Sequence, residues 1–355
     1  MKQIDAFTEQ YVSFFAALCL FLSAVEYAIP KPFPFMRLGL ANLPVLLSLF
    51  ILKKKDIFLL VVFKILGQAL ISGTLFSYIF IFSAAGSLAS AITMVLLYSL
   101  LNEKKCISFI GLSVAGSFAN NIAQIACARF ILFGENVKYI APVLLVTGMI
   151  TGILLGVFAE LFTRKSQWYA LILQNKTEGF AGVRIAEEKA EQSGGNTFFV
   201  MFEFAAVLII SIIFLFQKNA AVIWIFTGCF FIVAAVKKRG KIRIVSSLLM
   251  VLCILFFSIL LPYGKVLFSI GKLKITEEAL NSGLVRSGKL IGMVYLSQTF
   301  FSADITLPGK AGVFIARIFK FFNELNSEKI QFKKGSIISV IDERLLEIWK
   351  ETVSE

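Results

Sequence analysis

The sequence predicts an all-α protein that crosses a lipid bilayer many times. The chain of 355 residues is 58% hydrophobic and only 16% charged, whereas a soluble domain averages about 25% charged residues. Its mean hydropathy is +0.85. Apolar runs, some long enough for a spanning helix, follow one another along the chain. We therefore expect about 9–10 transmembrane helices in contact with the lipid bilayer.

Six apolar runs make up the first part of the chain, and they predict a six-helix membrane domain at residues 1–165. The runs are Tyr11–Ile29, Leu38–Leu52, Ile57–Ser72, Leu75–Leu101, Ile107–Phe133 and Tyr139–Phe162. Clusters of Lys and Arg follow the second, fourth and sixth runs, so these ends are expected on the cytoplasmic side of the membrane. The N-terminus is then expected to be cytoplasmic as well.

The remaining chain divides into three segments. Residues 166–197 are polar and mixed in charge, which predicts a cytoplasmic linker. Residues 198–326 contain further apolar runs and predict a second membrane domain. From Pro308 apolar and basic residues alternate, which predicts an amphipathic helix on the membrane surface or under a partner. Residues 327–355 predict a charged cytoplasmic tail, with a short strand at Ser336–Ile341.

Composition argues against several classes of function. The chain contains no His, which removes the commonest general base and metal ligand. Its five Cys form no Cys-x-x-Cys pair, so we expect no metal site, no cofactor and no catalytic residue. Asp occurs only at positions 5, 56, 304 and 342, too far apart for the aspartate-rich site that a prenyl-chain synthase needs. The net charge of +13 lies mainly between apolar runs, and we expect no nucleic-acid partner.

The proline-rich stretch at residues 28–44 is the first candidate binding site. Its three alternating prolines prevent a continued helix and favour an extended path. Lys31 and Arg37 flank this path and Asn42 follows it, so a stiff loop would present two cations and an amide to an anion. The alternative is a plain hairpin between two membrane helices, with both cations at the lipid headgroups.

The fifth apolar run carries polar side chains that are costly in hydrocarbon. Asn121 and Gln124 are three residues apart and share a helical face. Arg129 lies further towards the expected outer end. These residues either contact a ligand or hold neighbouring helices together through amide hydrogen bonds. We favour ligand contact because Arg129 is expected to point the same way.

Two other charged side chains lie within predicted spans. Glu26, near the outer end of the first run, is interpreted as a partner that neutralises Arg129 or the cations of the proline-rich stretch. Lys64 and Gln68 are four residues apart and share a face, which indicates either a lined cavity or a lysine that reaches towards the cytoplasm.

Small residues at four-residue spacing predict close helix packing. Gly148, Gly152 and Gly156 form a doubled G-x-x-x-G in the sixth run. Internal packing is the favoured interpretation for these glycines. Ala24 and Ala28 form a weaker version in the first run, where docking to another membrane subunit is the alternative.

The stretch from Pro32 to Asn42, PFPFMRLGLAN, together with the six runs, resembles a bacterial family called heptaprenyl diphosphate synthase component I, or Gx transporters. The resemblance covers about residues 10–165. That family is similar to the substrate-binding S components of energy-coupling factor transporters. The resemblance implies a bacterial cytoplasmic (inner) membrane protein, a binding role for Arg37 and Asn42, and a docking role for Ala24 and Ala28.

The second part of the chain more weakly resembles the T component of the same transporters. The similar part runs from Ile275 through Arg286 and on to Ser302–Pro308. T components continue into coupling helices with Ala-Arg-Gly or Ala-Arg-Ser motifs that engage ATPases. Here Ala316 and Arg317 precede Ile318, which argues against ATPase coupling and implies a shortened T-component-like domain.

Together these patterns predict a membrane binding or transport subunit for a small anionic ligand related to a vitamin, a flavin or an isoprenoid. The predicted ligand-binding residues are Lys31, Arg37, Asn42, Asn121, Gln124 and Arg129. The alternative is a non-catalytic membrane component associated with heptaprenyl diphosphate synthase and quinone synthesis, or with flavin-based extracellular electron transfer. Its partner would then be a soluble synthase or a redox protein.

Overall fold

The described structure is almost entirely helical, which confirms the all-α membrane architecture. The computed structural model describes residues 2–28, 38–101, 108–177, 197–237, 244–260, 264–270, 273–300, 309–327 and 337–354. Lys31 and Arg37 lie outside these residues. Four stretches of described helix are long and apolar enough to cross a bilayer, namely Glu9–Tyr27, Tyr78–Leu101, Phe109–Lys165 and Ala220–Lys237.

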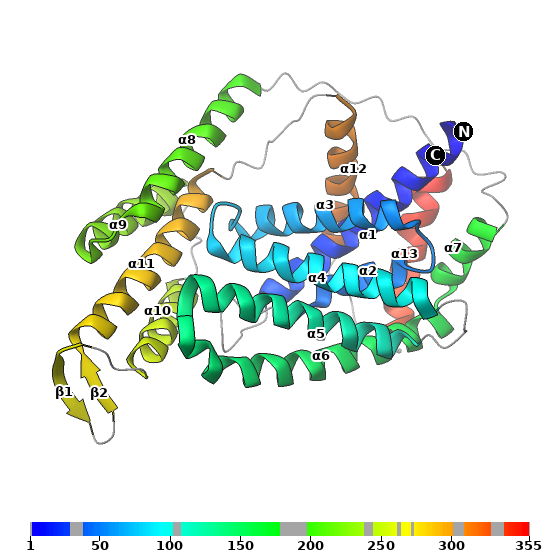
Figure 1. Cartoon of the computed structure of the whole chain (residues 1–355). Helices are drawn as coiled ribbons and strands as arrows, with labels where there is room; N and C mark the ends of the chain where they lie inside the picture. The colour runs from blue at the N-terminus through cyan, green and yellow to red at the C-terminus, as the bar shows by residue number, and fades with distance from the viewer. Residues whose placement is uncertain are drawn as a thin grey trace.

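The first part of the chain forms a bundle of long helices (Figure 1). Its elements are α1 (Lys2–Ala28), the 3-10 turn η1 (Leu40–Asn42), α2 (Leu43–Ser48), α3 (Lys54–Ser72), α4 (Tyr78–Leu101), α5 (Phe109–Ala128), the π-helical turn η3 (Arg129–Phe133), the 3-10 turn η4 (Gly134–Asn136) and α6 (Val137–Lys165). Helices α3 to α6 pack in chain order, each against the next.

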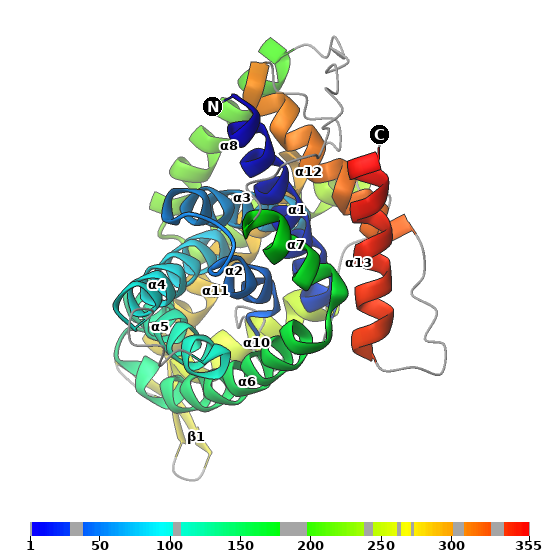
Figure 2. The same cartoon turned by 90° about the vertical axis from the view of Figure 1, so that its right-hand side faces the viewer.

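The second predicted span, Leu38–Leu52, is wrong as a spanning helix. Only the six residues of α2 are α-helical, which gives a length of about 9 Å at 1.5 Å per residue. All six side chains are buried, because α2 lies among α1, α3, α5 and α6 (Figure 2). An apolar run has the same hydropathy whether it faces lipid or fills a protein interior, so composition did not distinguish the two cases.

Helices α5 and α6 meet closely along the doubled glycine motif. A Cβ atom on Gly148 would overlap the side chain of Asn121, and one on Gly156 would lie 2.5 Å from the Cα of Ile110. Gly152 lies between them against Ser117. Glycine therefore allows the two backbones to approach at distances that any side chain would prevent.

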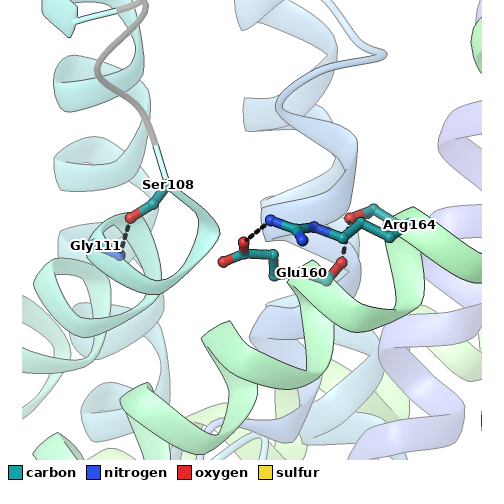
Figure 3. Close-up of polar contacts among 5 residues, drawn as sticks. Ser108, Gly111, Glu160 and Arg164 are labelled. Carbon is teal, nitrogen blue, oxygen red and sulfur yellow. Dashed lines mark hydrogen bonds and ion pairs between the residues drawn. The ribbon is translucent and has the colours of Figure 1, made fainter.

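The end of this packed pair carries two local polar contacts (Figure 3). The Oγ of Ser108 accepts a hydrogen bond from the backbone N–H of Gly111 at 3.0 Å and caps the start of α5. Arg164 pairs with Glu160 at 2.6 Å, one turn away on α6. The cap at Ser108 pairs one of the backbone donors that the first turn of a helix leaves unbonded.

The second part of the chain forms shorter helices and one hairpin. Its elements are α7 (Gln167–Thr177), α8 (Thr197–Phe216), α9 (Ala220–Lys237), α10 (Ile244–Ile259), β1 (Val266–Ile270), β2 (Leu273–Thr276), α11 (Glu277–Phe300), α12 (Gly309–Ser327) and α13 (Ile337–Ser354). Helices α8, α9 and α10 pack around α11. Strands β1 and β2 pair antiparallel, with Ser269 opposite Lys274, and project beyond α10 and α11 (Figure 1).

The two parts of the chain are joined by hydrogen bonds from a side chain of one part to a main-chain carbonyl of the other, and such bonds run in both directions. The Nη1 of Arg286 on α11 donates to the carbonyl of Leu132 at 2.8 Å. Asn136 of η4 donates through Nδ2 to the carbonyl of Phe257 at 2.6 Å. The two parts therefore meet where α5 ends and α6 begins.

The amphipathic helix expected after Pro308 is α12, and it packs against α1. Its buried positions repeat at helical spacing, at Phe314, Ile318, Phe321 and Leu325. This spacing places them on one face, the face that enters the same core as α1.

The strand expected at Ser336–Ile341 is wrong for the residues that the structure describes, since Ile337–Ile341 form the start of helix α13. Leu345, Ile348 and Trp349 share one buried face of this helix, and Trp349 packs on Tyr11 with 4.9 Å between ring centroids. Helical periodicity over this longer stretch outweighs the few β-branched residues near its start.

Candidate functional site

A small polar cavity lies inside the first bundle, between the end of α1, the η1 turn, α3, α4 and α5. Its lining residues are Glu26, Gly39, Ala41, Asn42, Lys64, Gln68, Ser83, Ser87 and Asn120. The cavity volume is about 10 Å³, enough for roughly one water-sized sphere. Polar side chains gathered in the interior of an apolar bundle usually mark a cavity or a substrate path.

The η1 turn is fixed in the bundle by Glu26, which is 1% exposed. Its Oε1 accepts a hydrogen bond from the backbone N–H of Leu38 at 2.9 Å. Its Oε2 accepts from Gly39 at 3.1 Å and from Leu40 at 3.0 Å. Gly39 has a φ of 86°, a left-handed conformation that glycine adopts without strain.

The backbone bonds show how Glu26 serves the fold. A buried carboxylate needs several hydrogen-bond donors to offset the loss of water. Three consecutive main-chain N–H groups supply them here, and Arg129, one of the cations predicted to pair with Glu26, binds elsewhere. Glu26 therefore holds the returning chain against the end of α1 and so positions Asn42 at the cavity.

Lys64, 2% exposed, places an ammonium group at the wall of the cavity. Its Nζ donates to Oδ1 of Asn42 and, at 3.2 Å, to Oγ of Ser87. The lined cavity that the spacing of Lys64 and Gln68 indicated is therefore present, with both residues in its wall. Three elements, η1, α3 and α4, meet at this one cation.

Two stripes of polar side chains run along α4 and α5 beside the cavity. Serines and amides recur at intervals of three and four residues, which keeps them on one helical face. They are Ser83, Ser87 and Ser90 on α4, and Ser113, Ser117, Asn120 and Gln124 on α5. A second cavity of about 10 Å³ includes Asn42, Ser90, Ser113 and Ser117 in its lining. This spacing is readable in the sequence, but serine is common in membrane helices, so the spacing alone does not identify these serines as part of a site.

The structure brings some predicted site residues together and separates others. Asn42 lines both cavities. Gln124 is 1% exposed and its amide lies beside that of Asn120. Asn121 points to α6 instead, where its Nδ2 donates to the carbonyl of Leu144 at 2.7 Å.

Arg129 does not reach the cavity. Its side chain is 55% exposed and its Nη2 pairs with Glu135 at 2.7 Å. It begins the π-helical turn η3, which lies beyond the end of α5. Ala24 is partly buried on α1, and the docking role of Ala24 and Ala28 stays a prediction.

The described residues hold no group of three or more Cys, Asp and Glu that could bind a metal ion. Acid–base chemistry within the cavity would depend on Glu26 and Lys64, and both already bind fixed partners. The arrangement is suited to holding a polar guest by hydrogen bonds and charge.

The fold and the site define a helical, multi-pass membrane protein with a small polar cavity within its first bundle. Residues 15–162 match the model of the family described as heptaprenyl diphosphate synthase component I. Residues 200–303 match a domain of unknown function, DUF8519. The similarity of this second part to a T component therefore stays a prediction. No curated protein and no solved structure matches the chain.

Proposed function

We propose that the protein is a membrane subunit that binds a small anionic ligand in the polar cavity of its first bundle, as a step in transport. The observation that carries this proposal is the position of Lys64, whose buried ammonium is bound by Asn42 and Ser87 in the cavity wall. Ammonium, amide and hydroxyl groups are those that bind carboxylates and phosphates in proteins.

The volume of the cavity adds a requirement for movement. About 10 Å³ admits one water molecule, which is too little for a ligand of several atoms. A ligand of several atoms requires α3, α4 or the η1 turn to separate. An open and a closed state are what a transport subunit needs.

Native mass spectrometry of the detergent-purified protein tests the proposal. The wild type should retain a small molecule that carries a carboxylate or phosphate. Lys64→Met should lose it, and Ser87→Ala, which removes one hydrogen bond, should weaken retention. Val62→Ala is the matched control, since Val62 lies on the same helix with 44% exposure. A wild type without such a molecule, or equal retention by Lys64→Met, would refute the proposal.

Orientation is also a proposal. Basic clusters beside the ends of the membrane helices favour a cytoplasmic N-terminus in a bacterial inner membrane. Labelling a cysteine introduced at Lys53, which is exposed where α3 begins, with a membrane-impermeant reagent should fail in intact cells and succeed after permeabilisation. Labelling in intact cells would show that residue 53 lies outside the cell and would contradict the proposed orientation.

A second candidate function follows from the family description, which names one component of a synthase. In this alternative the chain is a non-catalytic membrane partner of a soluble prenyl diphosphate synthase. It predicts that the purified protein retains a soluble synthase rather than a small molecule, and that Lys64→Met leaves this association unchanged.

A further inference from the structure

Among the described residues of the first bundle, Gln124 on α5 is a buried amide whose two polar atoms both lack a hydrogen-bond partner. Within the described part of the chain, neither its Oε1 nor its Nε2 has a hydrogen-bond partner, although the residue is 1% exposed. Most buried side-chain polar atoms in proteins are bonded, so an amide with both atoms unbonded calls for an explanation.

The surroundings of Gln124 place it at one end of the polar stripe. Asn120, which lines the cavity, lies one turn before it on α5. Both amides meet α4 at Gly86. A Cβ atom there would overlap Asn120 and lie 3.1 Å from Nε2 of Gln124. Glycine thus leaves the two amides the room that they occupy.

A primary amide presents a donor and an acceptor side by side. In nucleic-acid recognition the same geometry lets Asn and Gln read a donor–acceptor edge with two hydrogen bonds. A plain hydrocarbon or a bare anion cannot use both atoms. An amide, a lactam or a urea group can, because it offers the complementary acceptor and donor.

We infer that Gln124, with Asn120, forms an amide subsite, and that the ligand carries a neutral amide-like group in addition to its anionic group. This inference rests on the proposed function, since it concerns the ligand of the cavity that Asn120 lines and that Gln124 adjoins through Asn120. Lys64 holds the anionic end and Gln124 holds the donor–acceptor end. The subsite distinguishes such a ligand from a simple isoprenoid diphosphate, which has no N–H group.

The first test needs no ligand. Gln124→Met keeps the side-chain length and removes the unbonded amide, so the melting temperature of the full chain in detergent should rise by about 2–4 °C. Ile122→Ala is the control from the same helix, at a position 50% exposed, and should melt within about 1 °C of the wild type. A lower melting temperature for Gln124→Met would show that the amide is bonded, for example by water, and would overturn the inference.

The second test uses two small probes that differ in one group. Succinamate carries a carboxylate and a primary amide, whereas monomethyl succinate carries the same carboxylate and no N–H. Succinamate should raise the melting temperature of the wild type by about 2 °C or more near saturation, and monomethyl succinate should raise it less. Gln124→Met and Gly86→Ala should lose this difference, and Ile122→Ala should keep it.

The outcomes separate this inference from the proposed function. Equal responses to both probes, or a preference for succinamate that Gln124→Met retains, would overturn the amide subsite. A wild type that responds to neither probe would also overturn it. The proposed function would survive each of these results, because retention of an anionic molecule in a Lys64-dependent manner is measured without these probes.

Discussion

Replacing Asp342 with alanine should weaken the attachment of α13 to the rest of the protein while the membrane helices keep their packing. Asp342 on α13 is 7% exposed. Its carboxylate caps the N-terminus of a different helix, α7. Its Oδ2 accepts from the backbone N–H of Gln167 at 2.9 Å, and its Oδ1 accepts from Trp168 at 3.1 Å and from the hydroxyl of Ser166. Asp342→Ala leaves the first N–H groups of α7 without this acceptor.

The size of the effect follows from these bonds. Loss of a helix N-cap costs about 0.5–2 kcal/mol, and each hydrogen bond to a charged group contributes about 1.5–3 kcal/mol. These hydrogen bonds share one carboxylate, so their contributions are not additive. We expect the free energy needed to open α13 to be about 3–4 kcal/mol lower in Asp342→Ala than in the wild type. Since about 1.4 kcal/mol corresponds to a factor of ten, amide protection in α13 should fall by about 100- to 1000-fold.

Hydrogen exchange read by mass spectrometry measures this protection helix by helix. Glu343→Ala is the matched control, because Glu343 is the exposed neighbour of Asp342 and its loss should change protection less than about threefold. Protection in α4 and α5 should be unchanged in both variants. Equal exchange of α13 in the two variants would refute the capping role, and loss of protection throughout the bundle would refute the local nature of the contact.

Three further predictions concern packing, the η1 turn and pH. Gly156→Ala should lower the free energy of unfolding by about 1–3 kcal/mol through overpacking. Gly228→Ala should be nearly neutral, since no described atom lies within 4 Å of the added Cβ. Equal melting curves for the two variants would contradict the overpacking at Gly156. Glu26→Gln should lower the free energy of unfolding by about 1–3 kcal/mol, because one carboxylate oxygen that accepts backbone N–H groups is replaced by a donor. A melting temperature at or above that of the wild type would argue against the role of Glu26 in holding the η1 turn. Burial raises the pKa of Tyr169 above its usual value of about 10. The neutral phenol therefore stabilises the fold fully below about pH 10, and this contribution is lost as the pH rises further. Between pH 9 and 11 the melting temperature of the wild type should fall more steeply than that of Tyr169→Phe. Parallel curves of melting temperature against pH would contradict the raised pKa.

The helical membrane architecture could be predicted from the sequence because hydropathy and helix length are properties of local stretches. The same holds for the glycine motif, since four-residue spacing places Gly148 and Gly156 on one face wherever the helix lies. The polar character of the fifth run was also predicted. Each of these features depends on residues within one element.

The division of roles along α5 could not be predicted in this way. Asn121 and Gln124 are three residues apart, which separates their directions by about 60° around the helix. That angle is enough for Asn121 to bind the main chain of α6 while Gln124 meets α4 at Gly86. Spacing defines the angle between two side chains, and only the arrangement of neighbouring helices decides what each one contacts.

The sequence alone is sufficient to predict that this chain forms apolar helices and that few charges enter them, and it shows that histidine is absent. Packing in three dimensions makes the run after the proline-rich stretch return as the short buried helix α2, whose preceding turn Glu26 holds through backbone hydrogen bonds. It also decided that Lys64 meets Asn42 and Ser87 in one cavity. These contacts join residues that are 12 to 23 positions apart, and contacts at that separation depend on how helices pack, which no local pattern contains.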